Sequence, residues 1–324
     1  MLEKIIITNE NENQRLDKFL TEKLHEDSRS RIKKMIKQGL VLINNKPAKV
    51  HQFLKVNDEI TVLPDAETKA ETSVTQQSAT TLEPKIIFED NNFLVLDKPD
   101  GLLVHPTDLN EPGTLVEWVH QKYPEIETVG EYKYRGGIIH RLDKDVSGVI
   151  VIAKNDQTFY HLKEQFKQRQ VKKIYYALVY GHPTQPEGEI NLPIGRNKDG
   201  QFVAHPRRGT EKFNSKDKVA KTKYKVLEYI KDYTLLEVQI LTGRTHQIRA
   251  HLSAIGHPII GDQIYKPKKN FLHFFQHKVK VINPGRIFLH SAQIGFNDFD
   301  NHWVEFNSPL PEKLTAFLHE QKNK

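Results

Sequence analysis

One polar stretch divides this chain into two parts. Residues 65–84, DAETKAETSVTQQSATTLEP, are dominated by threonine, serine, glutamine and alanine and hold almost no large apolar side chain. Such a segment cannot bury enough surface to offset the entropy that it would lose on ordering. We therefore expect a flexible linker between residues 1–64 and residues 85–324. A chain of 324 residues is long enough for one large core and a smaller appended domain.

The composition excludes several classes of protein. The chain has no cysteine, which excludes disulfides, thiolate metal sites, iron–sulfur clusters and cysteine nucleophiles. No segment approaches the roughly 20 apolar residues of a membrane span, and the N-terminal residues lack the apolar core of a signal peptide. We expect a cytoplasmic protein with no membrane partner. The formal net charge of +7 permits an anionic partner such as nucleic acid without requiring one.

Two apolar patterns in the first part of the chain predict helices. Apolar residues recur at helical spacing in two runs, and Gly39 can end the second of them. The runs are Leu16, Phe19, Leu20 and Leu24, then Ile32, Met35, Ile36 and Leu40. Short apolar segments at residues 41–43 and 60–62 predict strands, with Asn45 and Asn57 at turns that favour a left-handed backbone. The pattern as a whole predicts a small helix–helix–hairpin domain.

The second predicted helix carries a one-sided charge. Five basic residues and no acidic residue lie between Ser28 and Gln38. They are Arg29, Arg31, Lys33, Lys34 and Lys37, and most of them lie opposite the apolar stripe on a helical wheel. One interpretation is a solvated helix face, but such a face usually mixes both signs of charge. The pattern favours contact with phosphate groups.

The larger part of the chain is rich in predicted strands. Residues 86–99 have the pattern of strand, turn and strand, and residues 138–154 that of a polar loop leading into a buried strand. Further strands are predicted at residues 172–181, 222–230 and 233–242, and helices at residues 155–170 and 246–256. Strands and helices seldom alternate regularly. We therefore predict an α+β domain built on a largely antiparallel mixed sheet with flanking helices.

Several familiar motifs can be excluded from the spacing of their residues. HRLD, residues 140–143, differs from the protein-kinase catalytic loop because leucine separates the arginine from the aspartate, and no DFG follows it. Gln201 stands where a phosphate-binding loop requires lysine, and the segment HQIRAH lacks the glutamate of a zinc-protease motif. The histidines of the chain show no metal-ligand pattern, so we expect no metal site.

Three polar residues remain as candidates for a site. Asp143 lies in a loop before a predicted buried strand, Tyr175 on a strand, and Arg249 on a helix. Singly, each has a structural explanation: a surface ion pair, a core ring with its hydroxyl at the edge, and a cap on a neighbouring strand. Together they would form a compact active site if the sheet brought them to one place.

At these residues the sequence resembles a known family. Five segments are similar, in order, to those of RluA-type RNA pseudouridine synthases, and the resemblance covers residues 85–310. They are KPDGLLVHPT, GGIIHRLDKDVSGVIVIAK, KKIYYALVYG, LTGRTHQIRAHLSAIGHPIIGD and RIFLHSAQIGF. Val146 departs from the family, which often has threonine there. The first part of the chain resembles a small S-four-like RNA-binding domain over RLDKFLTEKL, SRSRIKKMIKQGLVLINNKPAK and LKVNDEITV.

The resemblance implies a role for each candidate. Asp143 matches the catalytic aspartate, Tyr175 the tyrosine that stacks on the target uracil, and Arg249 the arginine that pairs with the aspartate. Arg141 matches a residue associated with the flipped-out nucleotide and the RNA backbone. Lys144, Arg244 and His246 are expected to contact RNA as well, together with the basic residues of the second helix.

The resemblance also implies an activity. The chain is expected to isomerise specific uridines to pseudouridine in large-subunit (23S) ribosomal RNA, as a monomer and without a cofactor, and transfer RNA remains an alternative substrate. Two other functions stay open from the residues alone. One is a catalytically silent RNA-binding or ribosome-assembly factor, and the other is a nucleoside hydrolase that would release free uracil.

Overall fold

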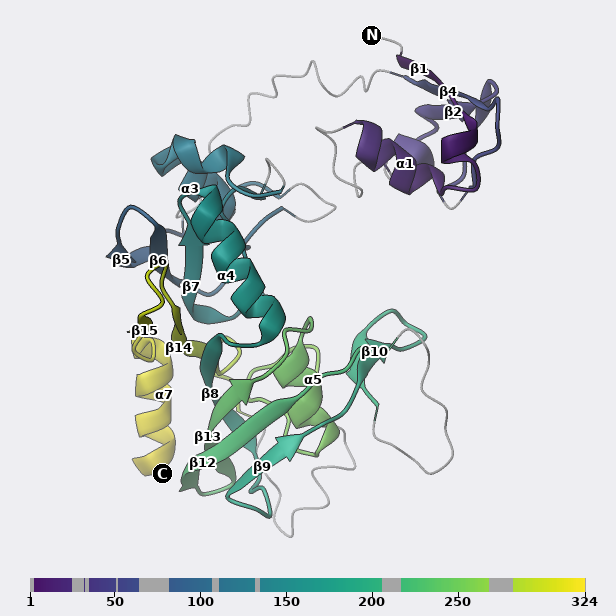
Figure 1. Cartoon of the computed structure of the whole chain (residues 1–324). Coiled ribbons are helices and arrows are strands. Elements are labelled where there is room, and N and C mark those ends of the chain that lie inside the picture. The colour runs from purple at the N-terminus through teal and green to yellow at the C-terminus, as the bar shows by residue number, and fades with distance from the viewer. Residues whose placement is uncertain are drawn as a thin grey trace, which may run out of the picture. The chain divides into compact units, whose positions relative to one another are not determined.

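The computed structural model describes residues 3–24, 32, 35–50, 52–63, 82–106, 111–131, 135–205, 217–267 and 282–323. The described residues up to Leu63 form one compact unit, and those from Leu82 onward form a second (Figure 1). Most of the linker expected at residues 65–84 lies outside the described residues, as do Arg29, Arg31, Lys33 and Lys34 of the basic cluster. No helix in the described ranges is long and apolar enough to cross a bilayer.

The first unit is a small sheet with its helical residues packed on it. Its strands lie in the order β1 (Glu3–Ile6), β4 (Glu59–Val62), β2 (Val41–Ile43) and β3 (Lys46–Pro47), all antiparallel to their neighbours. Helix α1 (Leu16–Lys23) follows the short 3-10 helix η1 (Asn9–Asn11). The apolar runs seen in the sequence form its core, with Leu16, Phe19, Leu20, Ile32, Met35 and Ile36 buried. Strand β1 was not predicted, since a short edge strand leaves little pattern.

The asparagine turns of this unit adopt the predicted backbone. Asn45 and Asn57 have φ angles of 63° and 69°, in the left-handed region that asparagine tolerates better than most residues. Lys37, the described member of the basic cluster, is exposed.

The second unit is built on a nine-stranded sheet, which confirms the predicted α+β class. The strand order is β5-β6-β7-β14-β8-β13-β12-β9, with β15 paired to β14. Seven of the pairings that form it are antiparallel and one, β7 with β14, is parallel. The strands are β5 (Lys85–Glu89), β6 (Phe93–Lys98), β7 (Ser147–Ala153), β8 (Lys172–Tyr180), β9 (Glu187–Ile190), β12 (Thr222–Ile230), β13 (Tyr233–Ile240), β14 (Leu289–Asn297) and β15 (Trp303–Asn307).

Helices flank this sheet. They are α3 (Leu115–Lys122), the 3-10 helix η3 (Pro124–Thr128), α4 (Asp156–Gln168), α5 (Gln247–Ala254) and α7 (Glu312–Asn323). Helix α4 contacts β7 and β14, while α5 contacts β12 and the separate two-stranded sheet formed by β10 (Ile194–Arg196) and β11 (Phe202–Ala204) (Figure 1). The two helices thereby stand over different parts of the same sheet.

Strand β7 is the buried strand that the sequence predicted. All seven of its residues are buried, because β6 and β14 flank it and helix α4 covers it. Gly148 has a φ of +115°, and a Cβ there would lie 2.1 Å from the carbonyl oxygen of Ser291 on β14. The close approach of β7 to β14 therefore requires glycine at the point where the loop with Asp143 enters the sheet.

Candidate active site

A cleft of about 520 Å³ opens beside the central strands of the second unit. Its walls come from the loop before β7, the end of α4, strand β8, and the turn that joins β13 to α5. Six residues singled out from the sequence line it: Arg141, Asp143, Tyr175, Arg244, His246 and Arg249. Lys144 is exposed and is not among the lining residues, although it adjoins Asp143. The sheet thus gathers side chains that lie more than a hundred positions apart.

The loop that carries Asp143 is anchored by a buried lysine. Lys98, which has no solvent exposure, donates hydrogen bonds from Nζ to the carbonyls of Pro99 and Leu102 at 2.8 Å and of Lys144 at 3.1 Å. The backbone nitrogen of Gly101 also donates to the Lys144 carbonyl, at 2.9 Å. These bonds tie the loop to the turn after β6 and so hold Asp143 at the mouth of the cleft.

His140 borders the cleft and supports the same loop. Its ring stacks on Phe166 of α4 with a centroid distance of 4.8 Å, and its Nε2 accepts a hydrogen bond from the backbone nitrogen of Val151 at 3.1 Å. Burial lowers the pKa of His140 to about 3, so the ring is neutral. His140 therefore acts as a structural residue, whereas the neighbouring Arg141 is exposed.

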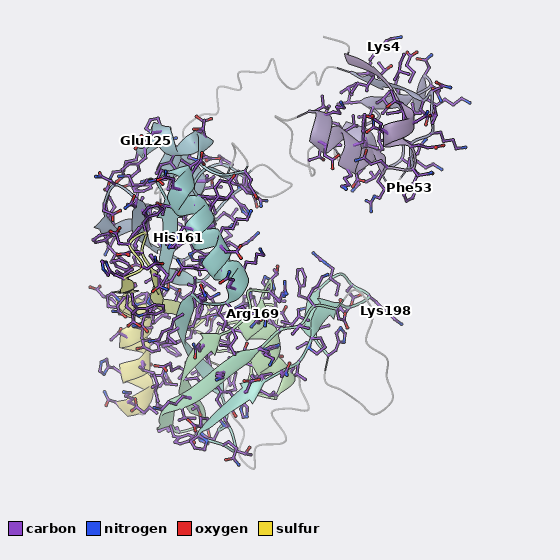
Figure 2. The ribbon with its side chains drawn as sticks, viewed as in Figure 1. Lys4, Phe53, Glu125, His161, Arg169 and Lys198 are labelled. Atoms are coloured by element: carbon purple, nitrogen blue, oxygen red, sulfur yellow. The ribbon has the colours of Figure 1, made fainter. Side chains whose placement is uncertain are left out.

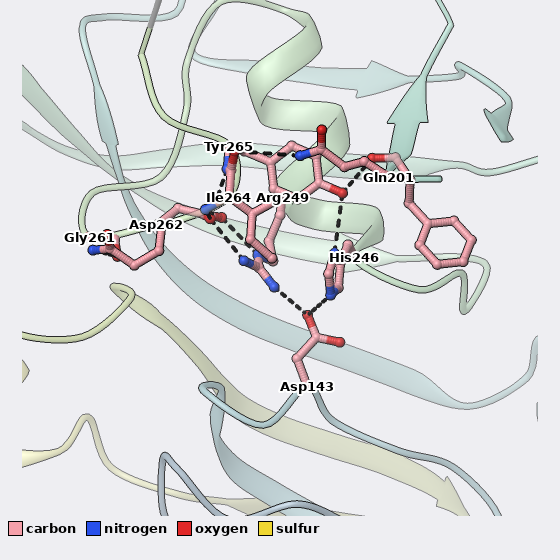
Figure 3. A network of polar contacts seen from close by, with 10 residues as sticks. Asp143, Gln201, His246, Arg249, Gly261, Asp262, Ile264 and Tyr265 are labelled. Atoms are coloured by element: carbon pink, nitrogen blue, oxygen red, sulfur yellow. Dashed lines mark hydrogen bonds and ion pairs between the residues drawn. The ribbon is translucent and has the colours of Figure 1, made fainter. Parts of the chain in front are cut away.

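Arg249 joins two carboxylates (Figure 3). Its Nε and Nη2 donate to Asp262 at 2.7 and 2.8 Å, and its Nη1 donates to Oδ2 of Asp143 at 3.2 Å. Asp262 in turn accepts from the backbone nitrogens of Ile264 and Tyr265, at 2.8 and 3.0 Å. Asp262 binds one edge of the guanidinium through two hydrogen bonds, which fixes the orientation of the whole planar group. The remaining nitrogen, Nη1, therefore points in a fixed direction, toward Asp143.

The contacts make this group an ion pair, and the pKa shifts agree with it. Burial by itself lowers the pKa of Arg249, but its hydrogen bond to Asp262 and the charges of Asp262 and Asp143 raise the pKa above its usual value. Burial likewise raises the pKa of Asp262, and the hydrogen bond and charge of Arg249 more than offset this, so that the net shift is downward. Arg249 is 4% exposed, and its positive charge is balanced within the protein.

Tyr175 lines the cleft from strand β8. The residue is 6% exposed and belongs to the main hydrophobic core. Burial raises its pKa well above the usual value, a hydrogen bond with Ser291 opposes the shift, and the charge of Asp143 adds to it. The phenol therefore keeps its proton. Tyr175 thus packs in the core and also borders the cleft.

His246 occupies a left-handed turn at the start of α5. Its φ is 55°, its Nε2 lies 3.8 Å from Oδ2 of Asp143, and its Nδ1 lies 3.2 Å from the hydroxyl of Tyr265 (Figure 3). Burial lowers the pKa of His246, the charge of Asp143 opposes this shift, and the charge of Arg249 adds to it. The imidazole is thus a neutral group beside the carboxylate.

Further cations surround the cleft and were not foreseen. They are Lys167 and Arg169 at the end of α4 and Lys173 on β8. Arg169, labelled in Figure 2, ends α4 in a left-handed conformation. Burial lowers the pKa of Lys173 to about 8, and its Nζ lies 5.1 Å from the centre of the Phe166 ring. Lys167 and Arg169 lie close together at the end of a predicted helix, just before a predicted strand. This pair of basic residues could have indicated an additional contact with RNA.

Asp262 and Tyr265 were also missed. Asp262 ends the IIGD segment, thirteen positions after Arg249, in a part of the sequence already singled out. A buried arginine needs a carboxylate partner, and a search of the same segment for one could have pointed to Asp262. As for metals, Asp298, Asp300 and His302 bring ligand atoms within 4.8 Å of one another, in the segment between β14 and β15 and outside the cleft lining.

Comparisons with known proteins agree with this fold. A family model described as RNA pseudouridylate synthase matches residues 92–254, and one described as S4 domain matches residues 14–60. The human protein RNA Pseudouridylate Synthase Domain Containing 4 has a similar solved structure, with a TM-score of 0.55 and 26% identity over 74% of this chain and 93% of that chain. The fold is therefore that of the RNA pseudouridylate synthases, which are isomerases that act on RNA.

Relatives match over nearly the whole length. An uncharacterized RNA pseudouridine synthase of Chloroflexus aurantiacus is 35% identical over 96% of this chain and 91% of the relative. Ribosomal large subunit pseudouridine synthase C of Vibrio parahaemolyticus is 32% identical over 94% and 92%, and synthase D of Nitrosomonas europaea is 35% identical over 95% and 85%. The chain belongs to the RNA pseudouridylate synthase family and carries an S4 domain ahead of its catalytic unit.

Proposed function

We propose that this enzyme isomerises specific uridines of large-subunit ribosomal RNA to pseudouridine, using the carboxylate of Asp143 and no cofactor. The contact of Asp143 with Arg249 at 3.2 Å, in the cleft that Tyr175 also lines, carries the proposal. The relatives named as large-subunit synthases C and D support the choice of RNA.

The reaction requires a negative group beside the sugar. The bond between N1 of uracil and C1′ of ribose breaks, the base turns, and a new bond forms between C5 and C1′. Positive charge develops on the sugar as the first bond breaks, and an ionised carboxylate can stabilise it or bond to C1′. Arg249 holds a positive charge against Asp143, while Asp262 balances that charge and fixes the guanidinium. Asp143 is thereby suited to act in its ionised form.

Tyr175 is proposed to retain the detached base. An aromatic ring that stacks on a base is worth about 1–3 kcal/mol in single-strand recognition. The raised pKa of its phenol keeps the residue uncharged, so that it offers a ring and a hydroxyl rather than a phenolate. The core packing of Tyr175 on β8 gives this ring a fixed position.

The basic residues around the cleft are proposed to bind the RNA backbone. The target uridine has to leave its stack before the cleft can receive it. Arg141, Arg244 and Lys144 surround or adjoin Asp143, and the exposed Lys37 belongs to the basic cluster of the S4 domain. The neutral His246 is proposed to contact the RNA as well. We assign residues 1–64 to an RNA-binding domain, residues 65–84 to a linker and residues 85–324 to the catalytic domain. Because the cleft is lined from a single chain, we also propose that a monomer is active.

Release of tritium from ribosomal RNA labelled at C5 of uridine tests the proposal, because isomerisation exchanges that hydrogen for the sugar. The protein is expected to release tritium and to leave no free uracil. Asp143→Asn is expected to abolish release while RNA binding survives. Asp145→Asn, in the same loop but exposed and outside the cleft lining, is the matched control and should retain activity. RNA binding without tritium release would identify a silent assembly factor, and free uracil would identify a hydrolase.

A further inference from the structure

Isomerisation ends with a proton transfer that needs an acceptor. After C5 of the uracil has bonded to C1′, that carbon carries both the sugar and its original hydrogen. The C5–H bond then breaks, its electron pair forms the C5=C6 double bond, and the pair of the C6=N1 bond moves onto N1, which takes a proton. The step needs no oxidant or reductant. It needs a base close to C5. That carbon is bonded to C1′, the sugar atom beside which Asp143 is proposed to lie.

We propose that Nε2 of His246 is this base and takes the C5 proton. The inference rests on the function proposed above and gives one residue of the same cleft a specific step. Nε2 lies 3.8 Å from Oδ2 of Asp143, so it borders the space that C1′ and the atom bonded to it would occupy.

Five other polar groups of the cleft are poorly suited to accept a proton from C5. Tyr175 has a protonated phenol with a raised pKa. Arg249 is a cation held by two carboxylates, and Arg141 and Arg244 are arginines as well, which stay protonated in proteins. Asp143 faces the sugar in the proposed reaction. His246 is the remaining base among the described residues in contact with Asp143.

A hydrogen-bond chain sets the tautomer of His246. The hydroxyl of Tyr265 donates its proton to the backbone carbonyl of Phe202, at 2.5 Å. A phenol has one proton, so its oxygen can only accept from Nδ1 of His246, 3.2 Å away. Nδ1 therefore carries the hydrogen of the neutral imidazole, and Nε2 keeps its lone pair toward Asp143. This is the tautomer that a base at Nε2 requires.

The ring is also held in place and kept neutral. It packs edge-to-face against the rings of Tyr265 and Phe202, with interplanar angles of 84° and 68° and centroid distances of 5.8 and 6.2 Å. Burial lowers the pKa of His246 and the nearby charges of Asp143, Arg249, Asp262 and Arg141 partly cancel, which leaves the imidazole unprotonated at neutral pH. When Nε2 takes the proton, the imidazolium faces the carboxylate of Asp143, which stabilises it until the proton passes to water.

His246→Asn tests the inference in the full-length protein. Asparagine tolerates the φ of 55° at this position, so the turn is preserved. The expected result is a fall in kcat of about 10²–10⁴-fold, the usual contribution of a general base. Single-turnover assays should compare RNA carrying hydrogen or deuterium at C5 of uridine. The variant is expected to show a primary isotope effect on pseudouridine formation that the unaltered enzyme lacks, because proton removal becomes rate-limiting.

Arg244→Gln in the same turn is the matched control. It removes an RNA contact from the cleft and is expected to raise KM without producing an isotope effect. A folded His246→Asn enzyme that also shows only a raised KM and no isotope effect would overturn the inference. His246→Gly provides a second measurement, since glycine accepts the turn and leaves room for free imidazole. Restored activity with imidazole supports a base at this site, whereas a folded but unresponsive variant opposes it.

The two proposals fail in different ways. If the unaltered protein releases no tritium from C5-labelled RNA, the proposed function is wrong. If it releases tritium and the His246 variants show neither an isotope effect nor rescue, isomerisation stands and another group takes the proton.

Discussion

Asp262 holds two nitrogens of the Arg249 guanidinium, Nε at 2.7 Å and Nη2 at 2.8 Å, and so leaves Nη1 to meet Asp143. The carboxylate of Asp262 is itself fixed by the backbone nitrogens of Ile264 and Tyr265. The turn after α5 therefore controls the direction of a charge that acts on the other side of the cleft. This arrangement gives Asp262 a positioning role that can be tested.

Asp262→Asn is expected to impair both stability and catalysis. Removing one charge from a buried ion pair costs about 3–5 kcal/mol, and an amide cannot accept from both guanidinium nitrogens as the carboxylate does. The free energy of unfolding should fall by that amount in denaturant titrations. The kcat for tritium release should fall with little change in KM, since Arg249 would lose its fixed direction. Normal kcat in the folded variant would show that Asp143 does not need a fixed Arg249.

Lys98→Met is expected to loosen the loop that carries Asp143. The Lys144 carbonyl would keep its bond from Gly101, but the carbonyls of Pro99 and Leu102 would lose the lysine donor. A buried acceptor left without a partner costs about 1–3 kcal/mol. Chemical denaturation should show at least this loss, with a fall in kcat. Lys85→Met, at an exposed position on β5, is the control and should change the stability by no more than about 0.5 kcal/mol.

Gly148→Ala is expected to destabilise the central sheet. The new methyl group would meet the Ser291 carbonyl at 2.1 Å, in a backbone conformation with φ of +115° that other residues rarely adopt. We expect a loss of more than about 1–3 kcal/mol, the cost of one residue held in a sparsely populated conformation. Gly243→Ala is the control for stability, because no heavy atom lies within 4 Å of its added Cβ. Equal melting temperatures for the two variants would contradict this account.

The pH profile of kcat/KM should contain a limb that depends on His246. The neutral imidazole is the active form, so activity should fall at pH values below the pKa of His246, where too little neutral base remains and proton removal becomes rate-limiting. Burial lowers that pKa, which places the limb below the usual histidine value of about 6.5. Well above the pKa of His246 the imidazole is fully neutral, so His246 causes no further change of kcat/KM with pH. In His246→Asn the limb should be lost, and an unchanged limb would assign it to another group.

The basic cluster of the S4 domain should control the salt dependence of RNA affinity. Each phosphate contact contributes about 0.7–0.9 to the slope of log K against log salt concentration. Changing Lys33, Lys34 and Lys37 together to glutamine is therefore expected to flatten the slope by about 2–3 if all three contact phosphate. Filter binding over a range of salt concentrations measures it. An unchanged slope would mean that the cluster is a solvated helix face.

Much of the fold could be predicted because it is encoded locally. The apolar run of β7 and the helical spacing in α4 and α5 are properties of neighbouring residues, and the structure has these elements within a few residues of the predicted bounds. Short edge strands such as β1 and β9 were not predicted, since three or four residues carry too little periodicity. The turn preference of Asn45 and Asn57 was visible because it belongs to single residues.

The sequence by itself determined the elements around the cleft, among them β7, α4 and α5, together with the family and the segments that hold the polar residues of the cleft. The tertiary structure decided which groups meet, because β14 lies between β7 and β8 in the sheet although it follows them by more than a hundred residues in the chain. That strand order brings Asp143 to Arg249, while the turn after α5 supplies Asp262 to Arg249 and Tyr265 to His246. The partners of Arg249 and the tautomer of His246 depend on distances between residues that are remote in the sequence. A local sequence pattern does not record such distances.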